Sequence, residues 1–261
     1  KYPKIKIFNN VDDSLSSNEF DGYTVATPAH THYEIAKKII CAEKHVLVEK
    51  PLTLNLTDAE ELNLLAKKNR VTLMVGHVML FHPAIIKIKE LIDSNALGNI
   101  HYIYSNRLNF GQVRTNEDVL WSLGPHDISI LLYLSNSSIV DLEAKGSDFL
   151  QKGIADSVLI SSTFKNGLES HIFESWLHPF KEHRLTVVGS NGMLSFEDSS
   201  ANKSIILYDK KYDLNNKIPI KIESENRIID YPKKQALTEE LSYFVKNMKL
   251  DIKKKSDGMH A

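Results

Sequence analysis

Residues 45–51 read His45-Val46-Leu47-Val48-Glu49-Lys50-Pro51, a short apolar run that ends in two charges and a proline. The apolar run predicts a fully buried strand, and Pro51 ends it because proline has no backbone N–H to donate to a neighbouring strand. The charged pair therefore leaves the strand at its carboxyl end. Open parallel sheets bind their ligands at that end, so the run predicts both a core strand and side chains beside a ligand site.

The sequence on both sides of this run alternates between strand and helix patterns. Strands are expected over residues 4–8, 22–26 and 71–75, and helices over residues 33–42 and 83–93. This alternation is typical of a parallel sheet that is covered by helices.

A capping box predicts the start of one more helix between the strands at 45–48 and 71–75. In this box the side chains of Thr57 and Glu60 each accept a hydrogen bond from the other residue's backbone N–H. Leu62, Leu65 and Ala66 would form the buried stripe of that helix.

After Gly98 the pattern changes to strands joined by tight turns. The expected strands cover residues 101–104, 157–164, 168–176, 184–188 and 193–196. The dipeptides Asn166-Gly167 and Asn191-Gly192 suit two-residue hairpins. We therefore expect an α/β dinucleotide-binding domain of the Rossmann type over residues 1–98 and an α/β domain with an open antiparallel sheet over residues 99–232.

Two helices are expected in this second half of the chain. One would begin near Pro125, which suits the first turn of a helix and would place His126 there as well. The other belongs to a C-terminal helical segment over residues 233–261. Its apolar face would be formed by Leu237, Leu241, Phe244, Val245 and Met248.

The composition excludes several classes of protein. The 261 residues include 32 basic and 33 acidic side chains, and the net charge of −1 argues against nucleic-acid binding through bulk charge. No apolar run reaches the roughly 18 residues of a membrane span, so we expect no membrane partner. A single cysteine, Cys41, excludes an internal disulfide framework and favours a cytoplasmic protein. The histidines lack the spacing of a metal site, and we expect no metal.

Lys50 and His126 are the candidates for chemistry. A lysine at the end of a buried strand can hold its ammonium group in a cleft and donate hydrogen bonds to a reacting oxygen, although a surface lysine beside a turn would look the same. A histidine in the first turn of a helix faces the positive end of the helix dipole, which favours the neutral, proton-accepting ring. A histidine held there by Asp127 or by the backbone is the alternative.

Three stretches in this order resemble the Gfo/Idh/MocA oxidoreductases. They are Val25-Ala26-Thr27-Pro28-Ala29-His30-Thr31-His32, His45 to Pro51, and the segment around His126. The resemblance covers nearly the whole chain. It implies an NAD(P)-binding Rossmann domain, a second domain with an open antiparallel sheet, and a homodimer or homotetramer formed through the open face of that sheet.

The resemblance also implies a role for each matching residue. Thr27, Pro28 and His32 would line the nicotinamide side of the dinucleotide, and Glu49 would contact its ribose or carboxamide. Lys50 would hydrogen-bond the substrate hydroxyl. His126 would take the proton of that hydroxyl while hydride leaves the same carbon for the nicotinamide, which is the balance that oxidation of a secondary alcohol requires. Many relatives carry an Asp four residues before this histidine, where this chain has Ser122.

Further stretches resemble the branch that oxidises the 3-hydroxyl of UDP-N-acetylglucosamine or its uronic acid. They include residues 107–114 and 175–181. The resemblance implies substrate contacts from Arg107, Asn109, Arg114, Trp121 and Lys181, with Arg184 as a further cation. Guanidinium groups match diphosphates and carboxylates in bidentate fashion, although each of these residues could equally be a surface charge. Another sugar or polyol substrate, or a non-catalytic cofactor or sugar sensor, stays open.

The glycine pattern of a dinucleotide-binding turn is missing from the sequence. None of the 11 glycines falls into Gly-x-Gly-x-x-Gly, and the residue that selects NAD or NADP follows that motif by about 20 positions. We expect NAD as the cofactor without excluding NADP. We also expect that the chain is cut at both ends and that these 261 residues alone bind dinucleotide weakly.

Overall fold

The computed structural model describes residues 5–115, 117–215, 218–248 and 255–260. The chain divides into two compact units. Unit 1 comprises Lys1–Val78 and Ala236–Ala261, and unit 2 comprises Met79–Gln235. Within the described residues, no helix is both long and apolar enough to cross a membrane.

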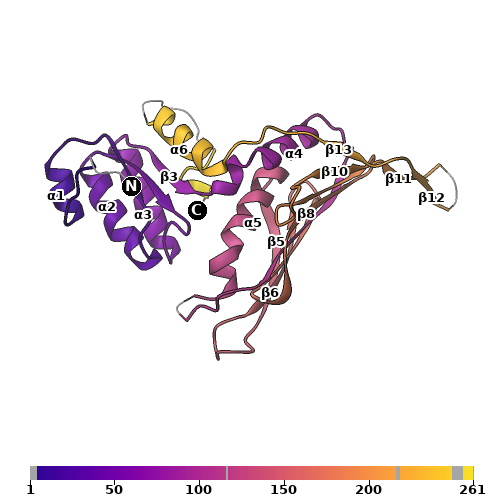
Figure 1. Cartoon of the computed structure of the whole chain (residues 1–261), viewed down its shortest axis with the longest axis horizontal. Coiled ribbons are helices and arrows are strands. Elements are labelled where there is room, and N and C mark those ends of the chain that lie inside the picture. The colour runs from indigo at the N-terminus through magenta and orange to yellow at the C-terminus, as the bar shows by residue number, and fades with distance from the viewer. Residues whose placement is uncertain (1–4, 116, 216–217, 249–254, 261) are drawn as a thin grey trace. The chain divides into compact units, whose positions relative to one another are not determined.

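Unit 1 is built on a parallel sheet of three strands in the order β1-β2-β3, of which Figure 1 labels β3. The strands are β1 (Gly22–Val25), β2 (His45–Glu49) and β3 (Leu73–Gly76). The helices α2 (His32–Cys41) and α3 (Leu56–Lys68) share one apolar core with the sheet, which contains Ile39, Ile40, Val46, Val48 and Leu62. The prediction of parallel strands is confirmed, because β1 pairs parallel with β2 and β2 pairs parallel with β3.

Two local predictions for unit 1 are wrong. Residues 5–8 form no strand, and Ile5 and Ile7 are 64% and 87% exposed, because a strand pattern without a paired neighbour leaves its backbone groups in water; Lys4 lies outside the described residues. The next residues instead form a short helix, α1 (Val11–Ser16), which Asn10 caps. Helix α3 is capped by Asn55, whose side chain accepts from Asp58 N–H at 2.8 Å, and not by a box at Thr57.

The eight-stranded sheet of unit 2 runs in the order β13-β10-β9-β8-β4-β7-β6-β5. Its strands are β4 (Ile100–Phe110), β5 (Ile139–Ser147), β6 (Ser157–Phe164), β7 (Glu169–Ser175), β8 (Leu177–Gly189), β9 (Met193–Glu197), β10 (Ile205–Tyr208) and β13 (Arg227–Ile229). All neighbours pair antiparallel except β4 and β7, which are parallel. The sheet is therefore mixed and mostly antiparallel, and the predicted hairpins β6–β7 and β8–β9 are present.

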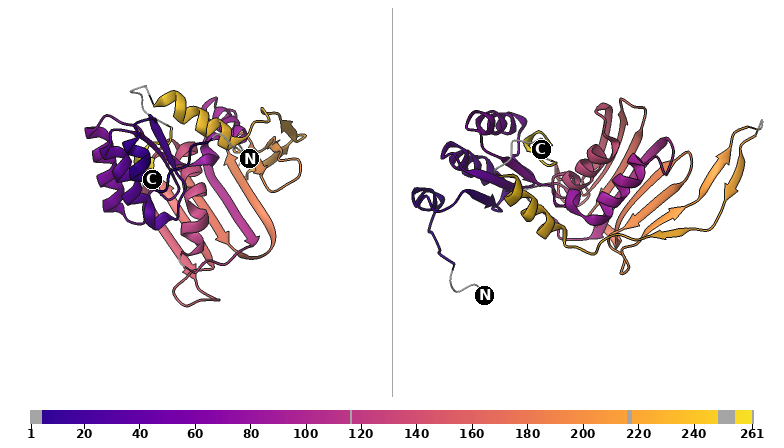
Figure 2. Two further views of the ribbon diagram at one scale, coloured as in Figure 1. Left: turned by 60° about the vertical axis from the view of Figure 1, so that its left-hand side comes forward. Right: turned by 90° about the horizontal axis from the view of Figure 1, so that it is seen from above.

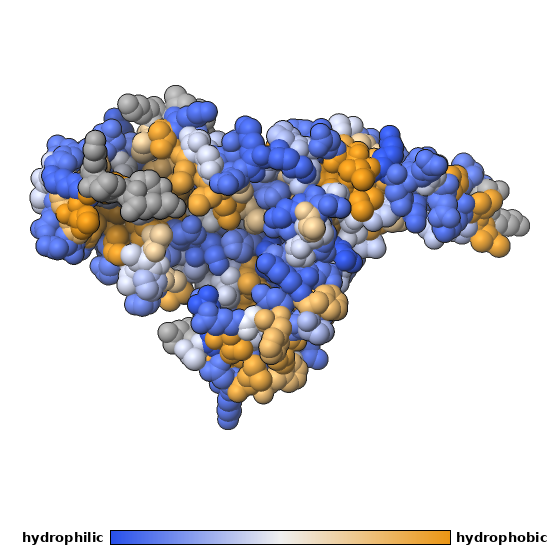
Figure 3. Space-filling view, in the orientation of Figure 1, coloured by the Kyte–Doolittle hydropathy of each residue, from blue (hydrophilic) through white to orange (hydrophobic). Residues whose placement is uncertain are grey.

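Helices cover one face of this sheet. The helices α4 (Pro83–Asp93) and α5 (Val119–Ser135) lie on this face (Figure 2). Their apolar residues share one core with inward side chains of the sheet such as Ile103, Ile160 and Leu185. A two-stranded arm is formed by β11 (Lys210–Asp213) and β12 (Ile220–Glu223), and it carries the exposed apolar side chains of Ile220 and Ile222. Hydrophobic surface is interspersed with hydrophilic surface along this arm in Figure 3.

Helix α5 begins six residues before the predicted start. Asp118 is its N-cap and accepts from Trp121 N–H at 3.0 Å, so Pro125 lies inside the helix and His126 is in its middle. A proline at 125 removes one hydrogen bond to the carbonyl of Trp121, a residue that is 40% exposed, where water can replace that bond. His126 therefore lies away from the positive end of the helix dipole, and its predicted place in the first turn is wrong.

The C-terminal helix α6 (Ala236–Asn247) is present, but its buried face matches the predicted one only in part. Its buried residues are Glu240, Phe244 and Asn247. Leu237, Leu241 and Val245 stay 38–60% exposed, so only part of the predicted apolar face packs in the core.

Candidate active site

The carboxyl ends of β1, β2 and β3 form one edge of the unit-1 sheet, which we call the carboxyl edge. It comprises the residues that leave these ends: Thr27 and Pro28 after β1, Glu49 to Pro51 at and after β2, and Gly76 and His77 at and after β3. The parallel topology thus collects residues that lie about 50 positions apart in the sequence. This is the edge at which open α/β sheets bind ligands.

His32 ties two loops of this edge together. It is 1% exposed, and its two ring nitrogens each lie 2.8 Å from a backbone carbonyl oxygen, Nδ1 from Pro51 and Nε2 from Thr27. The Thr31 hydroxyl also donates to the carbonyl of Pro28 at 2.8 Å. The structure therefore places His32 beneath the loops, while Thr27 and Pro28 are exposed above it.

Glu49 lies over the backbone of the neighbouring strand. Gly76 is its register partner, and a Cβ added at Gly76 would stand 3.0 Å from Glu49 Oε2 and 3.1 Å from Glu49 Cα. The N–H of Lys50 donates to the same carboxylate oxygen at 3.3 Å. A glycine at position 76 thus leaves room for a partly buried carboxylate at the carboxyl edge.

These residues fit one end of a dinucleotide. A carboxylate at the end of a parallel strand, such as Glu49, can accept hydrogen bonds from ribose hydroxyls. The Gly-x-Gly-x-x-Gly turn that would hold the pyrophosphate is not among the 261 residues. The carboxyl edge thus has the donor and acceptor groups that a ribose requires.

In unit 2, the residue after His126 is fixed by a buried polar network. Asp127 is 2% exposed, accepts from the Ser105 hydroxyl at 2.6 Å, and forms a short hydrogen bond with Arg107 Nε and a second one, of 3.3 Å, with Arg107 Nη2. Burial alone would raise the pKa of Asp127, but the charge and hydrogen bonds of Arg107 hold it below its usual value. His126 itself is partly buried.

The positive charge of Arg107 also acts on His183. Burial lowers the pKa of His183 to about 4, and the positive charges of Arg107 and Lys181 act in the same direction. His183 is the register partner of Arg107 on β8. At neutral pH it is therefore an uncharged ring.

The predicted substrate residues separate into two groups. Arg107 is 7% exposed and committed to Asp127. Trp121, Arg114 and Lys181 are exposed, and the buried amide oxygen of Asn109 has no hydrogen-bond partner among the described residues.

The remaining predicted cation, Arg184, is balanced by two carboxylates. Its Nε lies 3.0 Å from Oε2 of Glu197 and 3.7 Å from Oε1 of Glu182. Together with Lys181 it lines a shallow pocket of about 240 Å³.

The sequence analysis missed the role of Asp127 as the counter-ion of Arg107. A signal was present, because Arg107 occupies an inward position of β4, two residues after Ser105, and an inward arginine needs a buried acid. The partner could not be chosen from sequence, since it comes from a helix 20 residues away.

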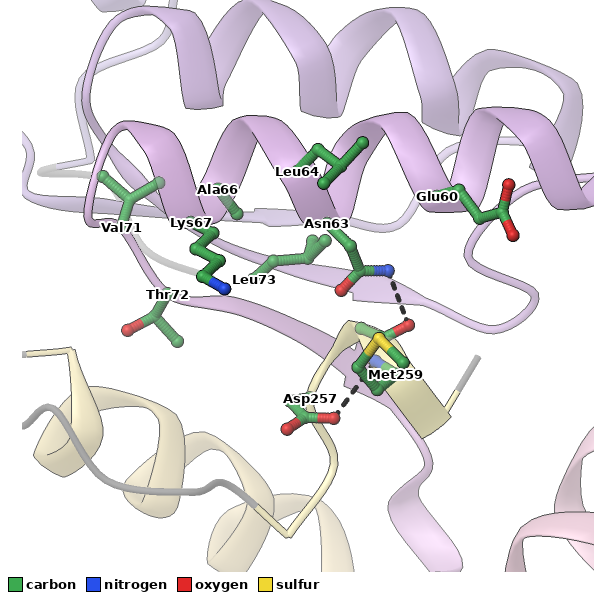
Figure 4. A pocket seen from close by; sticks show the side chains of 11 residues that line it. Glu60, Asn63, Leu64, Ala66, Lys67, Val71, Thr72, Leu73, Asp257 and Met259 are labelled. Carbon is green, nitrogen blue, oxygen red and sulfur yellow. Dashed lines mark hydrogen bonds between the residues drawn. The ribbon is translucent and has the colours of Figure 1, made fainter.

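One pocket of unit 1 lies away from all of these residues. It has a volume of about 620 Å³ and is formed by α3, the start of β3 and the segment at 257–259 (Figure 4). Asn63 Nδ2 donates to the carbonyl of Gly258 at 2.8 Å across it. None of the predicted site residues lines it.

Each of the two units contains a segment that matches a known protein-family model. Residues 1–77 match the model of the oxidoreductase family with an NAD-binding Rossmann fold, and residues 85–195 match the GFO/IDH/MocA C-terminal domain. The uncharacterised oxidoreductase YrbE of Bacillus subtilis is 26% identical, with 74% of this chain aligned to 60% of that protein. Myo-inositol 2-dehydrogenase of Thermotoga maritima is 24% identical over 94% of this chain and 74% of its own.

The UDP-N-acetylglucosamine 3-dehydrogenase of Acidithiobacillus ferrooxidans is similar in sequence and in structure. It is 26% identical over 93% of this chain and 74% of its own. Its solved structure superposes with a TM-score of 0.83 at 25% identity, covering 98% of this chain and 78% of that one. The match to the Rossmann model comes first along the sequence and contains the carboxyl edge. The match to the C-terminal domain follows it and contains most of the mixed sheet. The chain belongs to the Gfo/Idh/MocA oxidoreductase family, and its first unit carries that family's NAD-binding Rossmann fold.

Proposed function

We propose that this protein oxidises a secondary hydroxyl of a sugar with NAD, using Lys50 and His126. The observation that carries the proposal is the carboxyl edge, where Glu49 and Lys50 leave a buried strand opposite Gly76. Bound nicotinamide supplies a hydride acceptor. Glu49 and the exposed pair Thr27 and Pro28 hold the cofactor's ribose and carboxamide.

The proton is handled by the chain's own residues. The Lys50 ammonium donates a hydrogen bond to the substrate oxygen and stabilises the negative charge that develops there. His126 accepts the hydroxyl proton as the hydride leaves the carbon, so the product is a ketone and the charges balance. Asp127, paired with Arg107, is not available to share that proton.

For the substrate we propose a UDP-N-acetylhexosamine or its uronic acid, oxidised at C3. The support is the similarity to UDP-N-acetylglucosamine 3-dehydrogenase together with exposed Arg114, Trp121 and Lys181, which can meet a diphosphate and a ring. We assign Arg107 to the support of Asp127 and not to the substrate. Another sugar or polyol is the second candidate, favoured by the similarity to myo-inositol 2-dehydrogenase.

Substrate turnover tests the proposal. UDP-N-acetylglucosamine, its uronic acid and myo-inositol are offered with NAD, and NADH is followed by its absorbance. One of the nucleotide sugars is expected to react, and Lys50→Ala is expected to lose activity by at least about 100-fold. Activity that survives in Lys50→Ala contradicts the mechanism. Cofactor binding without turnover of any substrate favours a sensor.

We also propose that the helix-free face of the unit-2 sheet joins copies of the chain into a dimer or tetramer. The support is that α4 and α5 pack on one face, while Tyr102 and Leu159 remain 40% and 52% exposed. Light scattering of the wild type and of Leu159→Lys tests this. A monomeric wild type contradicts it.

A further inference from the structure

Helix α6 buries a carboxyl group that the activity proposed above does not use. The side chain of Glu240 is 0% exposed, and neither of its carboxyl oxygens has a hydrogen-bond partner among the described residues. An ionised carboxylate in such a place is strongly unfavourable. Glu240 therefore requires an explanation.

Glu240 lies on the same face of the unit-1 sheet as Glu49. A Cβ added at Gly22 of β1 would stand 3.4 Å from the ring of Phe244 and would also meet Met248, so this face of β1 is the one that α6 covers. Side chains alternate along a strand, and Gly22 pairs with His45. The same face therefore carries Leu47 and Glu49 on β2.

The direction of α6 brings Glu240 toward the carboxyl edge. The carbonyl of Asn247, at the end of α6, accepts from the Thr72 hydroxyl just before β3 begins, at 3.4 Å. Glu240 precedes Asn247 by two turns, which is about 10 Å along the helix. The helix thus runs from the carboxyl ends of the strands, where Glu49 lies, back to their amino ends.

The electrostatics agree with this placement. Burial raises the pKa of Glu240 to about 8, and the negative charge of Glu49 adds to the effect. Glu239 flanks it in the sequence of α6, and the charge that acts on it from the sheet is that of Glu49. Glu240 therefore keeps its proton at neutral pH.

We propose that Glu240 is a positioning residue of the carboxyl edge, where its uncharged carboxyl group avoids repelling the carboxylate of Glu49 on the same face of the sheet. Ionisation of Glu240 would place two carboxylates on one face, and their repulsion would move Glu49 from its place over Gly76. The proposal rests on the proposed function only in naming the cofactor as the ligand of Glu49. The proton itself needs neither cofactor nor substrate to be observed.

Carboxyl NMR of the whole chain, labelled with ¹³C at glutamate side chains, tests the inference between about pH 5 and pH 9. One resonance is expected to titrate near pH 8 and to be absent from Glu240→Gln. The resonance of Glu49, identified with Glu49→Gln, is expected to shift at the same pH in the wild type and not in Glu240→Gln. Glu34→Gln, which removes an exposed carboxylate from α2, is the matched control and should change neither signal.

Unfolding by urea gives an independent readout. Folded Glu240 holds a proton that the unfolded chain releases above its ordinary pKa of 4.5, so the wild type loses stability as pH rises from there to about 8. Relative to Glu240→Gln, its unfolding constant should rise about tenfold per pH unit in that range. In the NMR titration, Glu240→Gln has no proton to lose at position 240, so the Glu49 resonance should stay at its neutral-pH position.

Two results would overturn the inference. One is a Glu240 resonance that titrates in the ordinary range of glutamates. The other is a Glu49 signal that does not respond when Glu240 loses its proton. Neither result bears on turnover, so a failure here and a failure of the Lys50→Ala experiment are distinguishable.

Discussion

The carboxyl edge of unit 1 and helix α5 of unit 2 each supply one of the two residues proposed for catalysis, yet they relate to the sequence in different ways. At the carboxyl edge, an apolar run and a proline mark where β2 ends, and the parallel topology then fixes which strand ends are neighbours. In α5, Pro125 looks like a start and lies instead within the helix. The comparison teaches that a proline indicates a strand end more reliably than a helix start, because a helix can lose one hydrogen bond on its exposed side.

The largest expected difference between the two regions concerns stability. Arg107→Leu should lower the free energy of unfolding by about 3–5 kcal/mol, because it leaves Asp127 buried and unpaired. Lys50→Ala, at the partly buried carboxyl edge, should lower it by less than about 1 kcal/mol. Urea unfolding of both variants at neutral pH measures the difference.

A double variant separates the ion pair from general packing. Arg107→Leu with Asp127→Leu removes both charges and should recover a large part of the loss, since two apolar side chains leave no unpaired charge. A double variant no more stable than Arg107→Leu alone would mean that packing, and not charge, accounts for the loss. Equal losses for Arg107→Leu and Lys50→Ala would remove the contrast between the regions.

A smaller effect tests where α5 begins. Asp118→Ala should cost about 1.5 kcal/mol, because the N-cap bond to Trp121 N–H is lost. Pro125→Ala should not lower stability, since alanine restores a backbone donor inside the helix. Thermal unfolding of the two variants gives the comparison. A loss at Pro125 larger than the loss at Asp118 would mean that the helix starts where the sequence pattern placed it.

Sequence reasoning succeeded where a local pattern and a topological rule agree. The run at 45–51 is one such place. Its apolar residues predict the strand, Pro51 predicts where the strand ends, and the parallel order of the strands predicts that Glu49 and Lys50 lie at the carboxyl edge. It failed where a partner had to be chosen. The pairing of Arg107 with Asp127 depends on where α5 packs on β4, and no spacing in the sequence shows which acidic residue of the helix will face the arginine.

Helix α6 shows a second kind of failure. Leu237, Leu241, Phe244, Val245 and Met248 repeat at helical spacing and predict an apolar face. Of these only Phe244 is buried, together with Asn247 and, one turn before Phe244, Glu240. Periodicity counts apolar residues and cannot show that a carboxyl group is buried as an uncharged acid. The same limitation hid the one acidic group of α6 that lies on the face of Glu49.

The smallest effect concerns helix α3, which follows directly on the carboxyl edge. Asn55→Ala should cost about 1 kcal/mol, because the Asn55 side chain accepts from Asp58 N–H and so satisfies a donor that the first turn leaves open. Thr57→Ala should cost less than about 0.5 kcal/mol, since Thr57 is exposed within the first turn and does not cap it. Thermal unfolding of this matched pair decides between the two caps. A larger loss at Thr57 would mean that the capping box Thr57–Glu60 forms after all and that α3 begins later. The chain between Pro51 and the helix would then be longer.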